Sequence, residues 1–126
     1  MKILKFEEII AWQKAQDLAV EIYSHFKLIK DWDIKNQVCR ATVSISNNIA
    51  EGFDRNSNTE FRRFLFIALA SSSEVRSMLY LSKRLGYLNE EQTNLLLIKS
   101  NEISRIITGL IKSIEIKSIS IKASGN

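Results

Sequence analysis

The chain has 126 residues, of which 45% are hydrophobic and 25% charged, so it can form one domain with a buried core but not two ordinary domains. It contains no proline and only four glycines, which favours long helices over a turn-rich β fold. A single cysteine excludes a disulfide within the chain, and with a single histidine it makes a Cys/His zinc site implausible. The net charge of +4 permits an anionic partner without requiring one.

The compartment can be predicted from the N-terminus and from the apolar runs. Glu7 and Glu8 stand where a secretory signal would continue its apolar stretch. The longest uninterrupted apolar run, 64–70, is far shorter than the roughly 20 residues that cross a bilayer. We therefore expect a cytoplasmic protein with no membrane segment.

The first half of the chain contains two predicted amphipathic helices, at 6–27 and at 34–51. Asp31 or Asp33 can cap the second helix by accepting a backbone hydrogen bond, and Gly52 can end it in the left-handed conformation. The apolar positions recur at steps of three and four, at Ile9, Trp12, Ala15, Ala19, Ile22 and Phe26 and then at Ile34, Val38, Ala41, Ile45 and Ile49.

The second half contains two more predicted helices. Ser57 and Glu60 form an S-x-x-E capping box before a third helix that continues to a stop at Gly86. Residues 89–92 repeat the capping pattern before a fourth helix. After Lys112 isoleucines alternate with polar residues, which indicates either the end of the fourth helix with a frayed tail, at 113–126, or an added edge strand.

Four amphipathic helices joined by short connections pack most economically as antiparallel neighbours around one core. The predicted fold class is therefore all-α, an up-and-down antiparallel four-helix bundle formed by residues 1–112.

The predicted third helix is apolar on more sides than one core can bury, because the run 64–70 covers nearly two helical turns. We expect Phe64, Phe66 and Ile67 to lie at an interface between copies of the chain. The alternative is that neighbouring side chains cover this surface within the monomer.

Basic residues on a seven-residue spacing predict a basic face on the same helix, because a heptad drifts only about 20° per step. Such a face could bind nucleic acid through its phosphates. The alternative is a solvated face with salt bridges between subunits, and no RNA- or DNA-binding motif accompanies the pattern. The candidate residues are Arg55, Arg62, Arg76 and Lys83, widened by Arg63 and Arg84.

No constellation of catalytic, cofactor or metal-binding residues is found, so we expect a protein that is not an enzyme and has no small-molecule substrate. Glu51 and Glu74 are interpreted as members of ion pairs, for instance with Arg40, Arg55 or Arg62. We expect the Cys39 thiol to be buried rather than reactive. The serines 71–73 have no neighbouring histidine and no nucleophile elbow.

The sequence resembles a known family over residues 5–112. The residues that carry the resemblance are Trp12-Gln13-Lys14-Ala15, Arg40-Ala41, the stretch from Ser44 to Gly52, Arg55, Glu60-Phe61, Phe64-Leu65 and the segment from Ala68 through Ser71 to Glu74. Together they are similar to the four helix bundle proteins encoded within intervening sequences of bacterial 23S ribosomal RNA genes.

The resemblance implies an up-and-down bundle that assembles as a pentameric ring. It also implies kinship with the accessory bundle protein of diversity-generating retroelements, which associates with nucleic acid and a reverse transcriptase. No catalytic residue is established for the family, so none carries over.

The densest part of the family pattern suggests a polar cluster. Ser44 and Asn48, four residues apart, can share a helix face and bond across helices, which is a structural role. The functional alternative places Asn48, Glu51 and Arg55 at one end of the bundle, in contact with RNA or a partner protein. We therefore expect a homo-oligomeric accessory protein associated with RNA or a nucleic-acid-processing protein, or else a structural or protein-interaction module.

Overall fold

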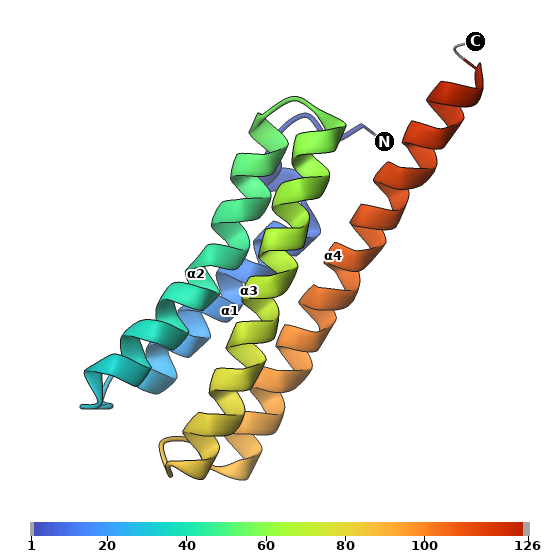
Figure 1. Ribbon diagram of the computed structural model, residues 1–126. Coiled ribbons are helices and arrows are strands. Elements are labelled where there is room, and N and C mark those ends of the chain that lie inside the picture. Colours follow the sequence, from blue (N-terminus) through green and yellow to red (C-terminus); the bar gives the residue numbers. More distant parts are fainter. Residues whose placement is uncertain (1, 125–126) are drawn as a thin grey trace.

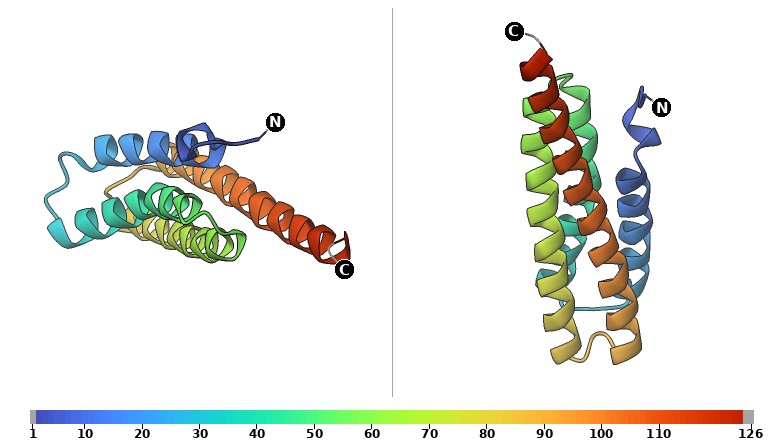
Figure 2. Two further views of the ribbon diagram at one scale, coloured as in Figure 1. Left: turned by 90° about the horizontal axis from the view of Figure 1, so that it is seen from above. Right: turned by 90° about the vertical axis from the view of Figure 1, so that its right-hand side faces the viewer.

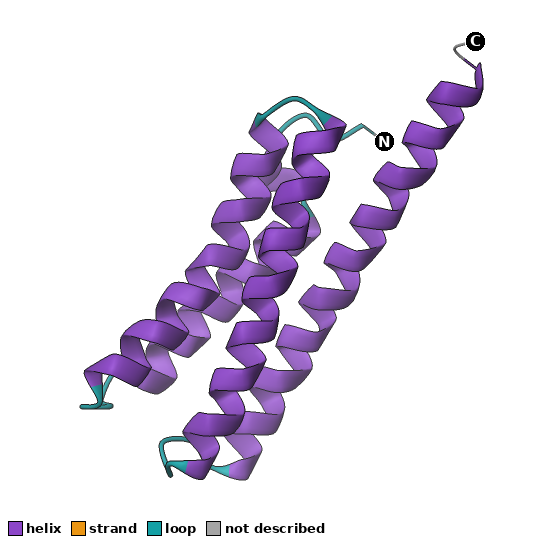
Figure 3. Cartoon of the chain, in the orientation of Figure 1, coloured by secondary structure: helices purple, strands orange, loops and turns teal. Residues whose placement is uncertain are grey.

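The structure is a computed structural model that describes residues 2–124, with side chains described as far as Glu115. A short 3-10 helix, η1 (Phe6–Glu8), precedes four α-helices, α1 (Ile10–Phe26), α2 (Trp32–Asp54), α3 (Asn58–Arg84) and α4 (Glu90–Ser124) (Figure 1). The described residues contain no strand (Figure 3).

The helices alternate in direction, and each packs against its two neighbours around the bundle (Figure 2). α2 contacts α1 and α3, and α4 contacts α3 and α1. The prediction of an all-α, up-and-down antiparallel four-helix bundle is confirmed. α4 extends past the ends of the other helices (Figures 1 and 2).

Predicted capping residues begin three of the helices. Asp31 accepts a hydrogen bond from a backbone N–H at the start of α2, at 3.2 Å, and the Ser57 hydroxyl does so at the start of α3, at 3.3 Å. Asn89 and Gln92 exchange side-chain and backbone hydrogen bonds of 2.8 and 3.0 Å before α4, which is a complete capping box. The positive φ of 81° at Gly86 confirms the predicted stop of α3.

Gly52 does not end α2, contrary to the prediction. The helix continues to Asp54, and the residue with a left-handed backbone is Asn56, with a φ of 58°. At Gly52 a Cβ atom would overlap the Cβ of Phe64 on α3. The glycine therefore allows α2 and α3 to approach closely.

Both ends of the chain differ from the predicted elements. The first α-helix begins at Ile10, because residues 6–8 form the separate 3-10 turn. The proposed edge strand after Lys112 is wrong, since α4 continues as a helix to Ser124. Gly125 and Asn126, at the end of the predicted tail, lie outside the described residues.

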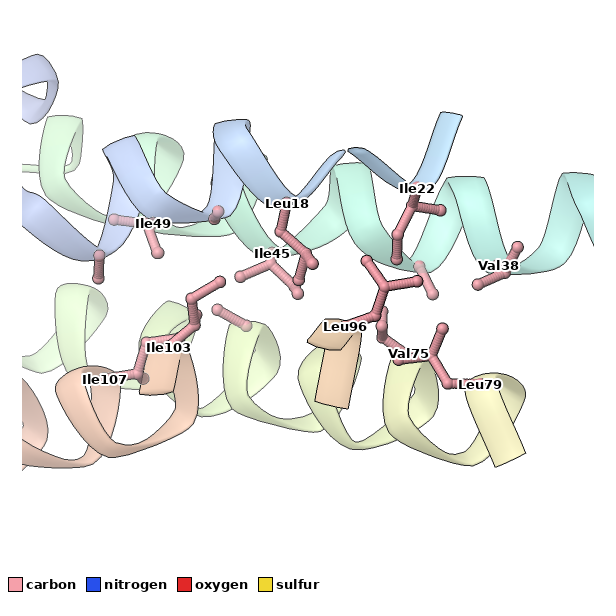
Figure 4. Close-up of a cluster of buried hydrophobic side chains, with 14 of the residues drawn as sticks. Leu18, Ile22, Val38, Ile45, Ile49, Val75, Leu79, Leu96, Ile103 and Ile107 are labelled. Atoms are coloured by element: carbon pink, nitrogen blue, oxygen red, sulfur yellow. The ribbon is translucent and has the colours of Figure 1, made fainter. Parts of the chain in front are cut away.

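The core is a column of aliphatic side chains contributed by all four helices (Figure 4). Cys39 is buried beside this column, and desolvation raises the pKa of its thiol, as expected for a structural cysteine. The labelled members of the column are Leu18, Ile22, Val38, Ile45, Ile49, Val75, Leu79, Leu96, Ile103 and Ile107.

Candidate interaction surfaces

The heptad of basic residues on α3 runs along the seam between α3 and α4. Arg62 binds Glu115 on α4 through its guanidinium, with an Nη2 to Oε1 distance of 2.7 Å. Arg76 donates to the Ser104 hydroxyl at 2.8 Å, and the Lys83 ammonium lies 3.6 Å from the Glu90 carboxylate. Arg62, Arg76 and Lys83 therefore share the side of α3 that contacts α4, whereas Arg55 precedes the helix and is not part of this stripe.

Arg55, just after α2, and Arg63, in the second turn of α3, both lie over the same aromatic ring. Their guanidinium carbons are 5.0 and 4.7 Å from the centroid of the Phe64 ring, which is cation–π geometry. Arg63 also donates to Glu60 at 2.8 Å, and this bond is the main reason that the pKa of Glu60 lies below its ordinary value. Arg55 binds Glu51 at 3.1 Å, which confirms the ion pair expected for Glu51.

The six predicted basic residues do not form one continuous patch. Arg55, Arg62 and Arg63 gather at the α2–α3 turn; we call these three the arginine cluster. Lys83 and Arg84 lie at the other end of α3, about 30 Å away at 1.5 Å per residue. Arg84 forms no ion pair with any described residue.

The family-motif residues separate into two groups. The Ser44 and Ser71 hydroxyls share a hydrogen bond of 2.9 Å, which links α2 to α3, and Asn48 donates to the Ser44 carbonyl and hydroxyl at 2.8 and 2.9 Å. The expected interhelical bond of Ser44 is confirmed, whereas the bonds of Asn48 stay within α2. Glu51 instead forms an ion pair with Arg55 of the arginine cluster.

The residues predicted at an interface between copies are only partly exposed. Phe64 is 6% exposed and buried within its own chain, so placing it on an outward surface was wrong. Phe66 and Ile67 are 45% and 38% exposed. Sequence reasoning missed Tyr80 and Leu81, which are also exposed on α3.

Small residues separate these exposed apolar side chains along α3. We call the resulting surface the outer face of α3. Its spacing of three and four residues was visible in the sequence and is the signal that would have extended the prediction. The outer face comprises Phe66, Ile67, Ala70, Ser73, Ser77, Tyr80 and Leu81, all of them exposed.

α3 is the one described helix whose length and composition would allow it to cross a membrane, and 39% of its apolar window is buried in the bundle. The core helix of a soluble protein passes the same test. The apolar residues of α3 are divided between the core and the outer face.

Two hollows on the outside of α2 were not predicted. The first, the α2 recess, has a volume of about 380 Å³ and is lined by Tyr23, Arg40, Val43, Ser44, Asn47 and Asn48. The second, the α2–α3 groove, has a volume of about 780 Å³ and is lined mainly by Asp33, Asn36, Gln37, Arg40, Ser44, Ser71 and Glu74.

Arg40 borders both hollows and forms no ion pair with a described carboxylate. Glu74 likewise has no ion pair in the described part of the chain, so the pairing expected for it was wrong. The sequence did contain a signal for the recess. Asn47 and Asn48 are poor helix formers in the middle of a helix, so their presence there indicates a role other than stabilising the helix.

The fold and these surfaces define an up-and-down four-helix bundle whose motif residues tie α2 to α3. The family model for the 23S rRNA-intervening sequence protein matches residues 7–109, and the chain belongs to this family. The expected family is thereby confirmed.

A solved structure is also similar to the chain. It is a protein with unknown function from the S23 ribosomal protein family from Bacteroides thetaiotaomicron, with 29% sequence identity and a TM-score of 0.77. The similarity covers 82% of this chain and 99% of that one. No curated protein is significantly similar to the chain.

Proposed function

We propose that the chain is a non-enzymatic, homo-oligomeric accessory protein that associates with RNA or with a ribonucleoprotein. The observation that supports RNA association is the arginine cluster, whose three guanidinium groups lie at one end of the bundle with side chains about half exposed. The pentameric ring implied by the family resemblance would repeat this cluster once per subunit.

The ion pairs of the cluster are compatible with phosphate binding. Exposed ion pairs contribute only about 0–1 kcal/mol, so an arginine can exchange a carboxylate for a phosphate at little cost. Guanidinium groups bind phosphate through two parallel hydrogen bonds, and release of condensed counterions adds affinity. Arg55 and Arg63 are the better pair for this exchange, because the ion pair of Arg62 connects α3 to α4 and theirs do not.

RNA titration with charge-neutralised variants tests this proposal. We expect the double change Arg55→Gln and Arg63→Gln to weaken binding of a short labelled RNA and to lower the salt dependence of the affinity by about one unit of slope per lost contact. Arg105→Gln is the matched control, because Arg105 is exposed on α4 away from the cluster. Equal binding by all variants, or none by the wild type at low salt, would contradict the proposal.

Self-association is supported by the outer face of α3. A monomer would leave Phe66, Ile67, Tyr80 and Leu81 in water on one helix. A second copy packed against this surface would bury them, and the small residues between them permit close approach of two helices. A sedimentation mass equal to one chain at micromolar concentration would contradict self-association.

A structural or protein-interaction module is the second candidate, and the seam between α3 and α4 favours it. Arg62, Arg76 and Lys83 all contact α4, so part of the basic face already has a role within the fold. Oligomers that form normally and bind no RNA at low salt would support this second candidate.

The proposal of a protein that is not an enzyme rests on residue types. The chain has one histidine and one cysteine, and the cysteine is buried with a raised thiol pKa. Among the described residues, no three His, Cys, Asp or Glu side chains gather in a way that could hold a metal ion.

A further inference from the structure

The α2 recess combines an aromatic ring, a guanidinium and two amides around a shallow hollow. Tyr23 is 51% exposed on α1, and it lines the hollow together with residues of α2. The volume of about 380 Å³ is near the lower bound of roughly 300–1,000 Å³ for small-ligand sites.

The polar groups of the recess have unused hydrogen-bonding capacity. Asn48 uses its Nδ2 hydrogens on Ser44, which fixes the orientation of the amide and leaves Oδ1 as an acceptor. Asn47 and Arg40 are exposed and form no side-chain hydrogen bond or ion pair with the described residues. By contrast, each guanidinium of the arginine cluster already has a carboxylate partner.

The charges around the recess disfavour a phosphate backbone as its occupant. Arg40 is the single charged residue of the lining, and the adjoining α2–α3 groove adds the carboxylates of Asp33 and Glu74. With one positive and two negative charges, the linings of the two hollows together carry a net charge of −1. Val43 is the single aliphatic side chain of the recess, so the apolar centre typical of a protein interface is also missing.

We propose that the α2 recess binds an unpaired nucleobase of single-stranded RNA. Unpaired bases are recognised by stacking on aromatic rings or guanidinium planes and by hydrogen bonds to their edges. Tyr23 and Arg40 supply the stacking surfaces, and Asn47 and Asn48 supply the hydrogen bonds. This inference rests on the proposed RNA association and specifies the form of RNA that the protein prefers.

The test compares a short single-stranded oligoadenylate RNA with a short duplex RNA, both fluorescently labelled, on the full chain at low salt. Stacking of one base contributes roughly 1–3 kcal/mol, which corresponds to an affinity change of about 5- to 150-fold. We expect Tyr23→Ala to weaken single-strand binding within this range and to leave duplex binding unchanged. Tyr23→Trp retains the stacking surface and should bind the single strand like the wild type.

Two further variants test whether the loss of single-strand affinity arises in the recess. Arg40→Gln should weaken single-strand binding in the same selective way. Trp32→Ala removes another exposed aromatic ring, one that does not line the recess, and should change neither affinity. Circular dichroism of each variant shows whether the bundle remains folded.

The outcomes separate this inference from the proposed function. Equal effects of Tyr23→Ala on both RNAs, or no effect on either, would contradict the nucleobase site in the recess. RNA affinity that still depends on Arg55 and Arg63 would continue to support RNA association. Failure of the wild type to bind either RNA overturns both. A fall in the oligomer mass of Tyr23→Ala, with unchanged RNA affinity, would identify the recess as a subunit contact and overturn the nucleobase site.

Discussion

The absence of a side chain at Gly52 determines how closely α2 and α3 approach. In an ordinary helix interior, alanine is more stable than glycine by about 1 kcal/mol. Here the added methyl group would overlap Phe64, a buried residue whose ring contacts two guanidinium groups. We expect Gly52→Ala to lower the free energy of unfolding by about 1–3 kcal/mol, because overpacking outweighs the gain in helix propensity. Urea unfolding measures the change.

Gly109 provides the matched control for that experiment. It lies within α4, and an added Cβ would meet no other atom within 4 Å. Gly109→Ala should therefore raise the free energy of unfolding by about 0.5–1 kcal/mol. A stabilising Gly52→Ala would show that Phe64 can move aside and that the close approach is not required.

A hydrogen bond between the two loops at one end of the bundle makes stability depend on pH. The Tyr87 hydroxyl donates to Asp31 at 2.7 Å, and this bond, followed by the Ile34 N–H, holds the pKa of Asp31 below its ordinary value. A lowered folded-state pKa stabilises the fold above the unfolded pKa of about 3.9, and the contribution is lost as the pH falls through the folded value.

Tyr87→Phe should therefore be less stable than the wild type near neutral pH. The difference should shrink as the pH is lowered from about 6 to about 2, because protonation of Asp31 weakens the bond in the wild type. Urea midpoints of both proteins across this range measure the difference. A constant difference would show that the contribution of the Tyr87 hydroxyl does not depend on the charge of Asp31.

The helices were predictable where the signals are local and not where they depend on a distant partner. Asp31, Ser57 and Gly86 act within one or two turns of the chain, and the structure confirms them. The sequence predicts a helix stop at Gly52, because only the tertiary contact with Phe64 explains a glycine inside α2. The candidate site was less predictable for the same reason, since the carboxylate that binds Arg62 is Glu115, 53 residues later.

The seam between α3 and α4 allows the structural role of the basic stripe to be measured. Arg62 binds Glu115 through two guanidinium nitrogens, at 3.0 and 2.7 Å, and both side chains are partly exposed. We expect a double-mutant cycle with Arg62→Ala and Glu115→Ala to give a coupling energy of about 0.2–1 kcal/mol that decreases at high salt.

The control for this cycle pairs Arg105→Ala with Glu115→Ala, because Arg105 is an exposed arginine of α4 that forms no ion pair with a described residue. Its coupling energy should be close to zero. A coupling near zero for Arg62 as well would leave the stripe free for an external anion.

The bundle presents different chemistry on different sides. The arginine cluster lies at the α2–α3 turn, the outer face of α3 carries exposed apolar side chains separated by small residues, and the α2 recess combines one guanidinium with two amides. Composition alone showed a basic and rather apolar chain, but it did not show which apolar residues remain outside the core. Phe64 and Phe66 illustrate this, because two positions along α3 separate a buried ring from an exposed one.

The outer face of α3 leads to a prediction about the assembly. Ile67 lies on this face and is 38% exposed, whereas Ile98 on α4 is 63% exposed but lies outside it. If exposure alone drove association, a charge at Ile98 would disrupt it more. We expect Ile67→Lys to reduce the sedimentation mass towards that of one chain, because a lysine in a packed helix interface is left without a partner. Ile98→Lys should keep the mass of the wild type, and the reverse result would move the interface from α3 to α4.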